Sequence, residues 1–200
     1  DAALRHGKHV AMVSKEPDSV VGPLFHRQAK AAGLIYTPVD GDQPSLLMQL
    51  VVWARVLGLE ILCAGKTSEY DFVYDPAAKR VTSLDRVADG RAVDALWEFG
   101  GREIRAVVQA RAEALTAIPQ HTVPDLVEMG LVANATGLAP DVPALHAPIA
   151  RTPEIADVLV PVEMGGILQG AGRVDVVNSL RRPDEASFAG GVFVVVRCED

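Results

Sequence analysis

The stretch that decides the fold is residues 8–66, which read KHVAMVSKEPDSVVGPLFHRQAKAAGLIYTPVDGDQPSLLMQLVVWARVLGLEILCAGK. Three β-rich runs stand out in it, KHVAMVS (8–14), LIYTPV (34–39) and LEILCAG (59–65). Apolar residues between these runs recur at steps of three and four, as they do along a helix. Strand, helix, strand, helix, strand at this spacing predicts an α/β layer in which the three strands are parallel neighbours.

Two helices are predicted between these strands. Ser19 is placed to cap the first helix, and Gly33 to end it. The second helix covers Ser45 to Leu57, with Pro44 where a first helical turn accepts proline. Because this second helix is apolar nearly all round, we expect it to be buried on several sides.

Beyond residue 66 the pattern changes from α/β to α+β. The stretch FVYDPAAKRVTSL (72–84) predicts a hairpin that turns at residues 75–78. Further elements are expected as helices at 91–99, 102–118 and 124–133 and as strands in RVDVVNSL (173–180) and VFVVVRCED (192–200). The last strand is apolar on both faces, which predicts a central position in a sheet.

The composition excludes several classes of protein. Of the 200 residues 49% are hydrophobic and 22% charged, which is too apolar for a disordered chain. With 26 acidic and 19 basic side chains the net charge is −7, and scattered cations argue against nucleic acid or an anionic membrane as partner. Two cysteines and the lack of a long apolar run or signal peptide predict a cytoplasmic location.

Polar side chains follow each of the three predicted strands. The first strand is followed by residues 14–17 (SKEP), the second by residues 40–43 (DGDQ) and the third by residues 65–68 (GKTS). Open α/β sheets bind ligands at the carboxyl ends of their strands. If the strands are neighbours, two lysines and two aspartates therefore converge on one rim.

The chemistry of these residue types suggests a role for each. Lys15 and Lys66 are predicted to polarise or protonate a substrate oxygen, because ammonium groups stabilise a developing alkoxide. Asp40 is predicted to be catalytic and Asp42 to bind substrate, by orienting hydroxyls or by holding Mg²⁺ or Mn²⁺. Gln43, at a helix N-terminus, suits an anionic ligand.

Plainer interpretations of the same residues stay open. The lysines could be solvated loop residues, and the aspartates could only cap a turn and the helix after it. Asn134 and Arg151 belong to a proline-interrupted segment that reaches the site as a substrate-binding lid or is simply a packed loop. GGILQGAG (165–172) is interpreted as a loop, because it does not open a strand-to-helix step. No metal ligand set is predicted, since the five histidines show no paired spacing.

Several segments carry a family resemblance. ALRHGKHVAMVSKE (3–16) and the turn VDGDQP (39–44) resemble homoserine dehydrogenases. EMGLVANATGLAPDVPALHAP (128–148) and LRRPDEASFAGGVFVVVRC (180–198) resemble the homoserine dehydrogenase-like branch that carries a C-terminal SAF domain and includes 1-deoxy-D-xylulose 5-phosphate reductoisomerase-like enzymes. The sequence departs from the homoserine dehydrogenases at AGKTSEYDFVYDP (64–76), where their segment is of the NGT type.

The resemblance implies the end of a Rossmann domain at residues 1–40, leading into a mixed-sheet catalytic and dimerisation domain at residues 41–200. It also implies an upstream domain that binds most of an NADPH, a SAF domain downstream, and a homodimer. Lys15, Glu16 and Pro17 are then expected to lie near the nicotinamide.

Taken together, these features predict the catalytic portion of an NAD(P)H-dependent oxidoreductase or reductoisomerase acting on a small phosphorylated or polyhydroxylated sugar-like substrate. Two alternatives remain. One is a sugar-acid oxidoisomerase or a homoserine-type dehydrogenase without an isomerase step, and the other is a non-catalytic oligomerisation module.

Overall fold

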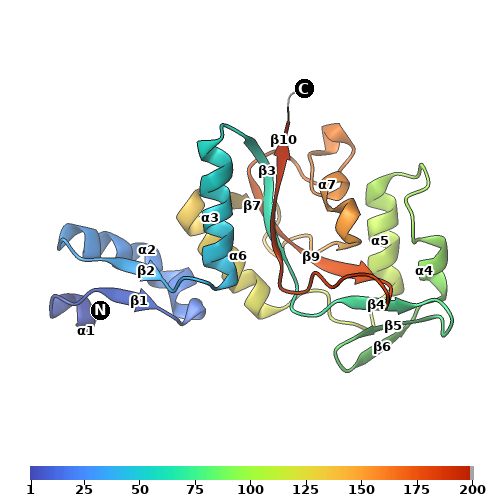
Figure 1. Cartoon of the computed structure of the whole chain (residues 1–200), viewed down its shortest axis with the longest axis horizontal. Coiled ribbons are helices and arrows are strands. Elements are labelled where there is room, and N and C mark those ends of the chain that lie inside the picture. The colour runs from blue at the N-terminus through green and yellow to red at the C-terminus, as the bar shows by residue number, and fades with distance from the viewer. Residues whose placement is uncertain (199–200) are drawn as a thin grey trace.

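A computed structural model describes residues 1–198 and contains two sheets with helices packed against them (Figure 1). The helices are α1 (Ala2–Arg5), α2 (Lys15–Ala31), α3 (Gln43–Val56), α4 (Arg91–Ala95), α5 (Ile104–Ala114), α6 (Val123–Thr136) and α7 (Ile155–Val158). The strands are β1 (Val10–Met12), β2 (Tyr36–Pro38), β3 (Glu60–Thr67), β4 (Phe72–Asp75), β5 (Arg80–Ser83), β6 (Arg86–Asp89), β7 (Ala139–Pro140), β8 (Ile149–Ala150), β9 (Arg173–Arg181) and β10 (Val192–Arg197).

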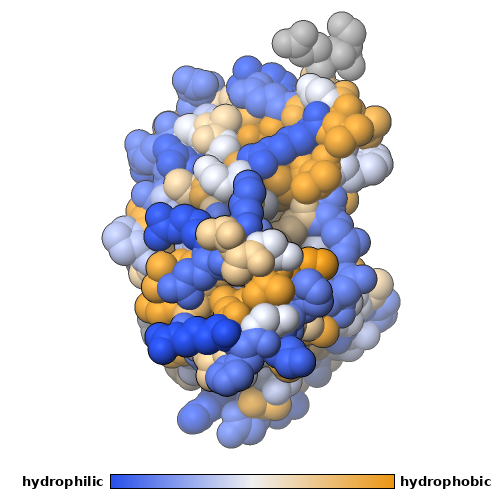
Figure 2. Space-filling view, turned by 90° about the vertical axis from the view of Figure 1, so that its left-hand side faces the viewer, coloured by the Kyte–Doolittle hydropathy of each residue, from blue (hydrophilic) through white to orange (hydrophobic). Residues whose placement is uncertain are grey.

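The N-terminal unit consists of α1, β1, α2 and β2, at the left of Figure 1. Its two strands are parallel, with Val10 opposite Tyr36, and they form a sheet of their own. The face of the molecule that carries this unit shows apolar surface between hydrophilic side chains (Figure 2). Val13, Val20 and Ile35 of the unit are exposed, so much of its apolar surface is uncovered in this chain.

Helix α2 begins four residues before the predicted cap at Ser19. Its first turn contains Glu16, Pro17 and Asp18. Acidic side chains are favoured at the positive end of the helix dipole, and proline lacks only a donor that a first turn does not use. Lys15, Glu16 and Pro17 are therefore part of α2, whereas the predicted helix begins only at its cap Ser19.

The larger sheet has eight strands, in the order β10-β3-β9-β4-β5-β6, with β7 and β8 also paired to β9. Strand β9 runs parallel to β3, β4, β7 and β8, whereas β10 runs antiparallel to β3. The fold is thus mixed α/β with a mixed sheet, as the change of pattern along the sequence predicts. The hairpin predicted at residues 72–84 is confirmed by the antiparallel pairing of β4 with β5.

Two expectations about strand positions are wrong. Strand β3 does not extend the sheet of β1 and β2, because both of its edges are paired with β9 and β10 from the end of the chain. The final strand is not central: β10 stands at the edge, and only Val195 of it is buried. The central strand is β9, whose residues 174–180 are all buried. Residues 199–200 of the predicted last strand lie outside the described residues.

Helices cover both faces of the large sheet. On one face α3 and α6 bury Leu47, Val51 and Met129 against Val174 and Val176 of β9, and Figure 1 shows these helices between the sheet and the N-terminal unit. A second cluster on the sheet joins the strands to α5 and α7. Helix α3 is less buried than its composition predicts, since Val52, Trp53 and Val56 are exposed. No helix within residues 1–198 is both long and apolar enough to cross a membrane.

A buried ion pair fixes α5 to the segment that follows β8. Arg111, whose side chain is fully buried, donates from both terminal nitrogens to Glu154, at 2.6 and 2.9 Å, and also donates to the Leu96, Trp97 and Ile149 carbonyls. We expect Arg111→Met to lower the free energy of unfolding by about 3–5 kcal/mol, because it leaves the Glu154 carboxylate buried without its partner. Urea denaturation measures this, with exposed Arg55→Met as the control; equal effects from both would contradict a structural role for the pair.

A half-buried histidine gives the fold a pH dependence. His146 Nδ1 lies 2.7 Å from Asp175, and this hydrogen bond raises the pKa of His146 above 6.5 although burial opposes it. Because the pKa of His146 is higher in the folded than in the unfolded state, the charged form stabilises the fold. This contribution to the free energy of unfolding is fully present below about pH 6.5 and is lost as the pH rises through the folded-state pKa. We expect the free energy of unfolding to fall over that window and His146→Gln to flatten the fall. Exposed His6→Gln is the control and should leave the slope unchanged.

Candidate functional site

Lys66 lies inside β3 with its side chain completely buried. Its ammonium contacts the Glu128 carboxylate directly and lies 3.0 Å from Asp125 Oδ1 and 3.0 Å from Gln43 Oε1. Asp125 and Glu128 are three residues apart on α6, a spacing that puts both on one face of a helix. The first turn of α3 supplies Gln43. Two helices, α6 and α3, therefore surround one buried cation of β3 with oxygen atoms.

Lys15 reaches the same carboxylate from the N-terminal unit. Its ammonium contacts Glu128 Oε1, whereas Lys66 contacts Oε2, so Glu128 bridges the two lysines. Asp42, the residue that caps α3, lies 3.0 Å from the Lys15 ammonium. The Lys15 side chain is 30% exposed and Glu128 only 2%. These side chains extend from a partly exposed lysine to a fully buried one. We call them the lysine–carboxylate cluster, which consists of Lys15, Asp42, Gln43, Lys66, Asp125 and Glu128.

The surroundings keep both lysines charged. Burial by itself lowers a lysine pKa, and it is the largest single influence on each. The hydrogen bonds and charges of Glu128 and Asp42 more than offset burial at Lys15, and those of Glu128 and Asp125 do so at Lys66, so both pKa values are raised. Such ammonium groups donate hydrogen bonds and stabilise negative charge, but they are poorly suited to act as nucleophiles.

Hydrogen bonds connect the cluster to the central strand. Ser68 Oγ lies 3.1 Å from Asp125 Oδ2 and 3.0 Å from Asn178 Oδ1 on β9. Thr122, the N-cap of α6, donates to the same Asp125 oxygen at 2.7 Å. Side chains in the middle of such a network lose rotational freedom, so the position of Asp125 beside Lys66 is fixed from two sides.

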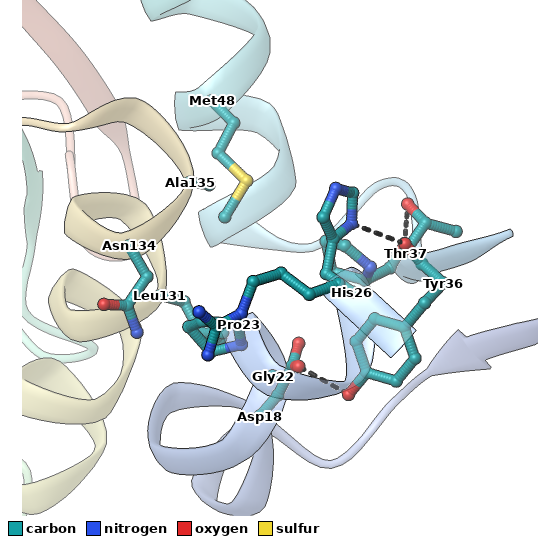
Figure 3. A pocket seen from close by; sticks show the side chains of 12 residues that line it. Asp18, Gly22, Pro23, His26, Tyr36, Thr37, Met48, Leu131, Asn134 and Ala135 are labelled. Carbon is teal, nitrogen blue, oxygen red and sulfur yellow. Dashed lines mark hydrogen bonds between the residues drawn. The ribbon is translucent and has the colours of Figure 1, made fainter. Parts of the chain in front are cut away.

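A cavity of about 620 Å³ lies between the N-terminal unit and helices α3 and α6 (Figure 3). Helices α3 and α6 form one side, with Met48 and Leu131, and α2 and β2 form the other, with His26 and Tyr36. A smaller hollow, lined by Lys15 and Asp42 among others, shares Asp18, Pro38 and Leu131 with this cavity. The cavity therefore gives a ligand space close to the partly exposed lysine.

A buried tyrosine and aspartate form part of the cavity wall. The Tyr36 hydroxyl donates to Asp18 Oδ1 at 2.7 Å, and burial together with this contact raises the pKa of Tyr36. A Cβ at Gly22 would lie 2.2 Å from the same oxygen, so α2 needs glycine there to leave room for the pair. The hydrogen bond between Tyr36 and Asp18 thus fixes the position of both side chains in this part of the wall.

The structure places the predicted site residues in different positions. It brings Lys15, Lys66, Asp42 and Gln43 together, and Glu16 and Pro17 lie beside Lys15 in the first turn of α2. Asp40 is outside the cluster; it is exposed and accepts a hydrogen bond from Gln49 at 2.6 Å. The reason is that Asp42, two residues later, is the one that caps α3 and thereby faces Lys15.

Asn134 and Arg151, which were predicted to reach the site on a lid, do not form a lid. Asn134 lies on α6, where it donates to the Ser19 carbonyl of α2 at 2.8 Å and lines the cavity. Arg151 follows β8, which pairs with β9 at Asn178 and Ser179, and it lines a different pocket. The segment between them is held down on β9, because Asp175 accepts from the backbone N–H groups of His146 and Ala147. It is a packed loop.

Sequence reasoning missed Asp125 and Glu128. Their signal is two carboxylates at helical spacing on a predicted helix whose other residues are mostly apolar (PDLVEMGLVANA, 124–135). Buried acids on such a face need a cation nearby, and Lys15 and Lys66 supply it.

The cluster is a poor fit for a divalent cation. The Lys66 ammonium already stands between Asp125 and Glu128, and Asp42 is engaged by Lys15. No group of three or more His, Cys, Asp or Glu side chains within residues 1–198 could hold a metal ion. We therefore assign no step to Mg²⁺ or Mn²⁺.

The bridging role of Glu128 can be measured. We expect Glu128→Gln to lower the pKa of both Lys15 and Lys66, because an amide keeps the shape but removes the charge that offsets burial. Carbon-13 NMR titration of the lysine side chains reports both values. Glu69→Gln is the control, since Glu69 is 51% exposed and lies 3.4 Å from Lys66, and its effect should be much smaller. Unchanged lysine values in Glu128→Gln would contradict the bridge.

Comparisons with known proteins show the family of this chain. A family model described as oxidoreductase DRL, catalytic domain, matches residues 41–200. A 1-deoxy-D-xylulose 5-phosphate reductoisomerase of Thermus thermophilus is 42% identical over 50 residues, a stretch that covers 25% of this chain and 14% of that enzyme. The match spans a small part of the relative, whereas the family model covers most of this chain. The chain therefore belongs to the family of oxidoreductase DRL catalytic domains.

Proposed function

We propose that the chain is the catalytic, substrate-binding portion of an NAD(P)H-dependent oxidoreductase or reductoisomerase that acts on a small phosphorylated or polyhydroxylated sugar-like substrate. Membership in an oxidoreductase family and the partial similarity to a reductoisomerase support this class. The observation that carries the proposal is the pair of charged lysines on one buried carboxylate, next to a cavity.

Lys15 is the group that would meet the substrate. It is partly exposed, it borders the small hollow that shares wall residues with the cavity, and its ammonium is held by Glu128 and Asp42. When a carbonyl carbon accepts a hydride, its oxygen gains negative charge, and a nearby ammonium stabilises that charge and gives up a proton to form the hydroxyl. NADPH, bound mainly by a domain outside this chain, would supply the hydride.

Lys66 has a different part in the same proposal. Its side chain has no exposed surface, so in this arrangement it acts through Glu128 and does not touch the substrate. By balancing one carboxylate oxygen, it lets the other hold Lys15 in place without an excess of buried negative charge. Lys66 is then a positioning residue, and Gln43 and Asp125 hold it there.

The wider organisation of the protein also belongs to this proposal. We place the end of a nucleotide-binding domain at residues 1–40 and the catalytic domain at residues 41–200, with a SAF domain downstream, in a cytoplasmic homodimer. The exposed Val13, Val20 and Ile35 of the N-terminal unit support a further segment packing there. A parallel pair such as β1 and β2 is seldom stable alone, and this favours a larger sheet in the complete protein.

The lysines are tested in the complete enzyme. We expect Lys15→Ala and Lys66→Ala each to lower kcat/KM at least about tenfold. The first removes charge stabilisation that grows in the transition state, and the second removes the cation that lets Glu128 hold Lys15 in place. Lys15→Arg should recover part of the loss, and exposed Lys8→Ala should have no effect. Circular dichroism checks that Lys66→Ala is folded, with Lys66→Arg as the alternative if it is not. Near-normal turnover in a folded lysine variant would remove that lysine from the mechanism.

The substrate class is tested with a panel of phosphorylated and unphosphorylated hydroxyketones and hydroxyaldehydes. Analysis of the carbon skeleton of each product separates a reductoisomerase from a simple dehydrogenase. If the complete enzyme neither oxidises nor reduces any of these compounds with either nicotinamide cofactor, the proposed function is contradicted.

A further inference from the structure

A second pocket, lined in part by arginines, lies at the end of β9. It has a volume of about 360 Å³, and none of the residues of the lysine–carboxylate cluster lines it. Its walls come from the segments around Arg151 and Arg181 and from the loop between β9 and β10. We propose that this pocket binds the phosphate group of a small phosphorylated ligand, at a site separate from the lysine–carboxylate cluster.

Arg151 supplies the main donor. Its side chain is 16% exposed, and its Nε is buried and has no hydrogen-bond partner within residues 1–198. The guanidinium carbon lies 4.8 Å from the centre of the Trp97 ring, which fixes the plane of the group. A buried N–H without an acceptor costs free energy. Because Arg151 lines the pocket, an oxyanion bound there can accept hydrogen bonds from its guanidinium group.

Other donors lie around the same pocket. Arg181 also lines it, and Arg182 stands over the same tryptophan ring at 4.7 Å. The hydroxyl-bearing residues Thr152 and Ser187 are on the wall. Guanidinium groups in a fixed plane, with hydroxyls beside them, match the several acceptor oxygens of a phosphate monoester better than the two of a carboxylate.

Carboxylates around the pocket set the strength of binding. Glu98 lies 2.5 Å from Arg151 Nη1, and Asp71 lies 2.5 Å from Arg181 Nε. Glu185 lines the pocket itself, 3.5 Å from Arg151 Nη2, while its other oxygen accepts from the Arg182 backbone N–H. Glu185 therefore competes with an incoming anion for Arg151, and its removal should strengthen binding.

The remaining wall is apolar. Pro153, Leu180, Ala186 and Phe188 line the pocket beside the arginines. They suit the short carbon skeleton of a phosphate monoester. Inorganic phosphate, which lacks that skeleton, should bind more weakly than an ester.

The experiment uses glycerol 3-phosphate as the probe and Trp97 as the reporter. The chain has two tryptophans, so Trp53→Phe leaves Trp97 as the only one. We expect saturable fluorescence changes with glycerol 3-phosphate, weaker binding of inorganic phosphate and none of glycerol. Arg151→Gln should weaken binding at least about tenfold, because a charge-assisted contact is lost. Glu185→Gln should strengthen it about threefold or more, by removing the competing charge.

Matched variants decide where the probe binds. Glu163→Gln removes the same charge as Glu185→Gln from an exposed site elsewhere and should not change the affinity. If Arg151→Gln fails to fold, Glu185→Gln and Ser187→Ala, which should weaken binding, carry the test. Lys15→Ala should leave binding intact, and loss of binding in that variant would move the phosphate to the lysine–carboxylate cluster and overturn the proposal. No saturable change at about 10 mM probe, or an unchanged affinity in Glu185→Gln, would also overturn it.

Discussion

The bridge from Lys15 through Glu128 to Lys66 is the constraint that organises the rest of the structure. It joins the N-terminal unit, α6 and β3, three segments that are distant along the chain. A buried carboxylate is stable only when cations and donors surround it, and a fully buried lysine needs the same from acceptors. If the N-terminal unit separated from α6, Glu128 would lose one of its two lysines, so the bridge favours the arrangement that encloses the cavity.

The local part of the fold was predictable because it depends on short-range patterns. The strand and helix order of residues 8–66 and the hairpin of β4 and β5 follow from apolar periodicity and turn residues. Sheet order was not predictable in this way. Strand β3 pairs with β9 and β10, more than a hundred residues later, and β10 is as apolar as a central strand although it stands at the edge. No pattern within residues 8–66 indicates that β9 and β10 are the partners of β3.

The same contrast applies to the site. The prediction located Lys15, Lys66, Asp42 and Gln43 because polar residues at strand ends and helix starts are a local signal. The actual reason they meet is different, since Lys66 is inside β3 and the sheets are separate. Glu128 was missed because its role depends on which helix packs over β3. In such a case the stronger sequence signal is a charge within an apolar helix, because burying it requires a partner elsewhere.

Strand β9 explains how precise positions arise from these distant parts. It is buried along most of its length, yet it carries Asp175, Asn178 and Arg181. Asp175 holds the loop at His146, and Asn178 bonds the Ser68 hydroxyl that contacts Asp125. Arg181 lines the pocket at the strand's end. Polar groups on a buried strand cost free energy unless each is satisfied, so each specifies one arrangement of the segment it bonds. The lysine–carboxylate cluster thus takes its geometry from the central strand as well as from its own charges.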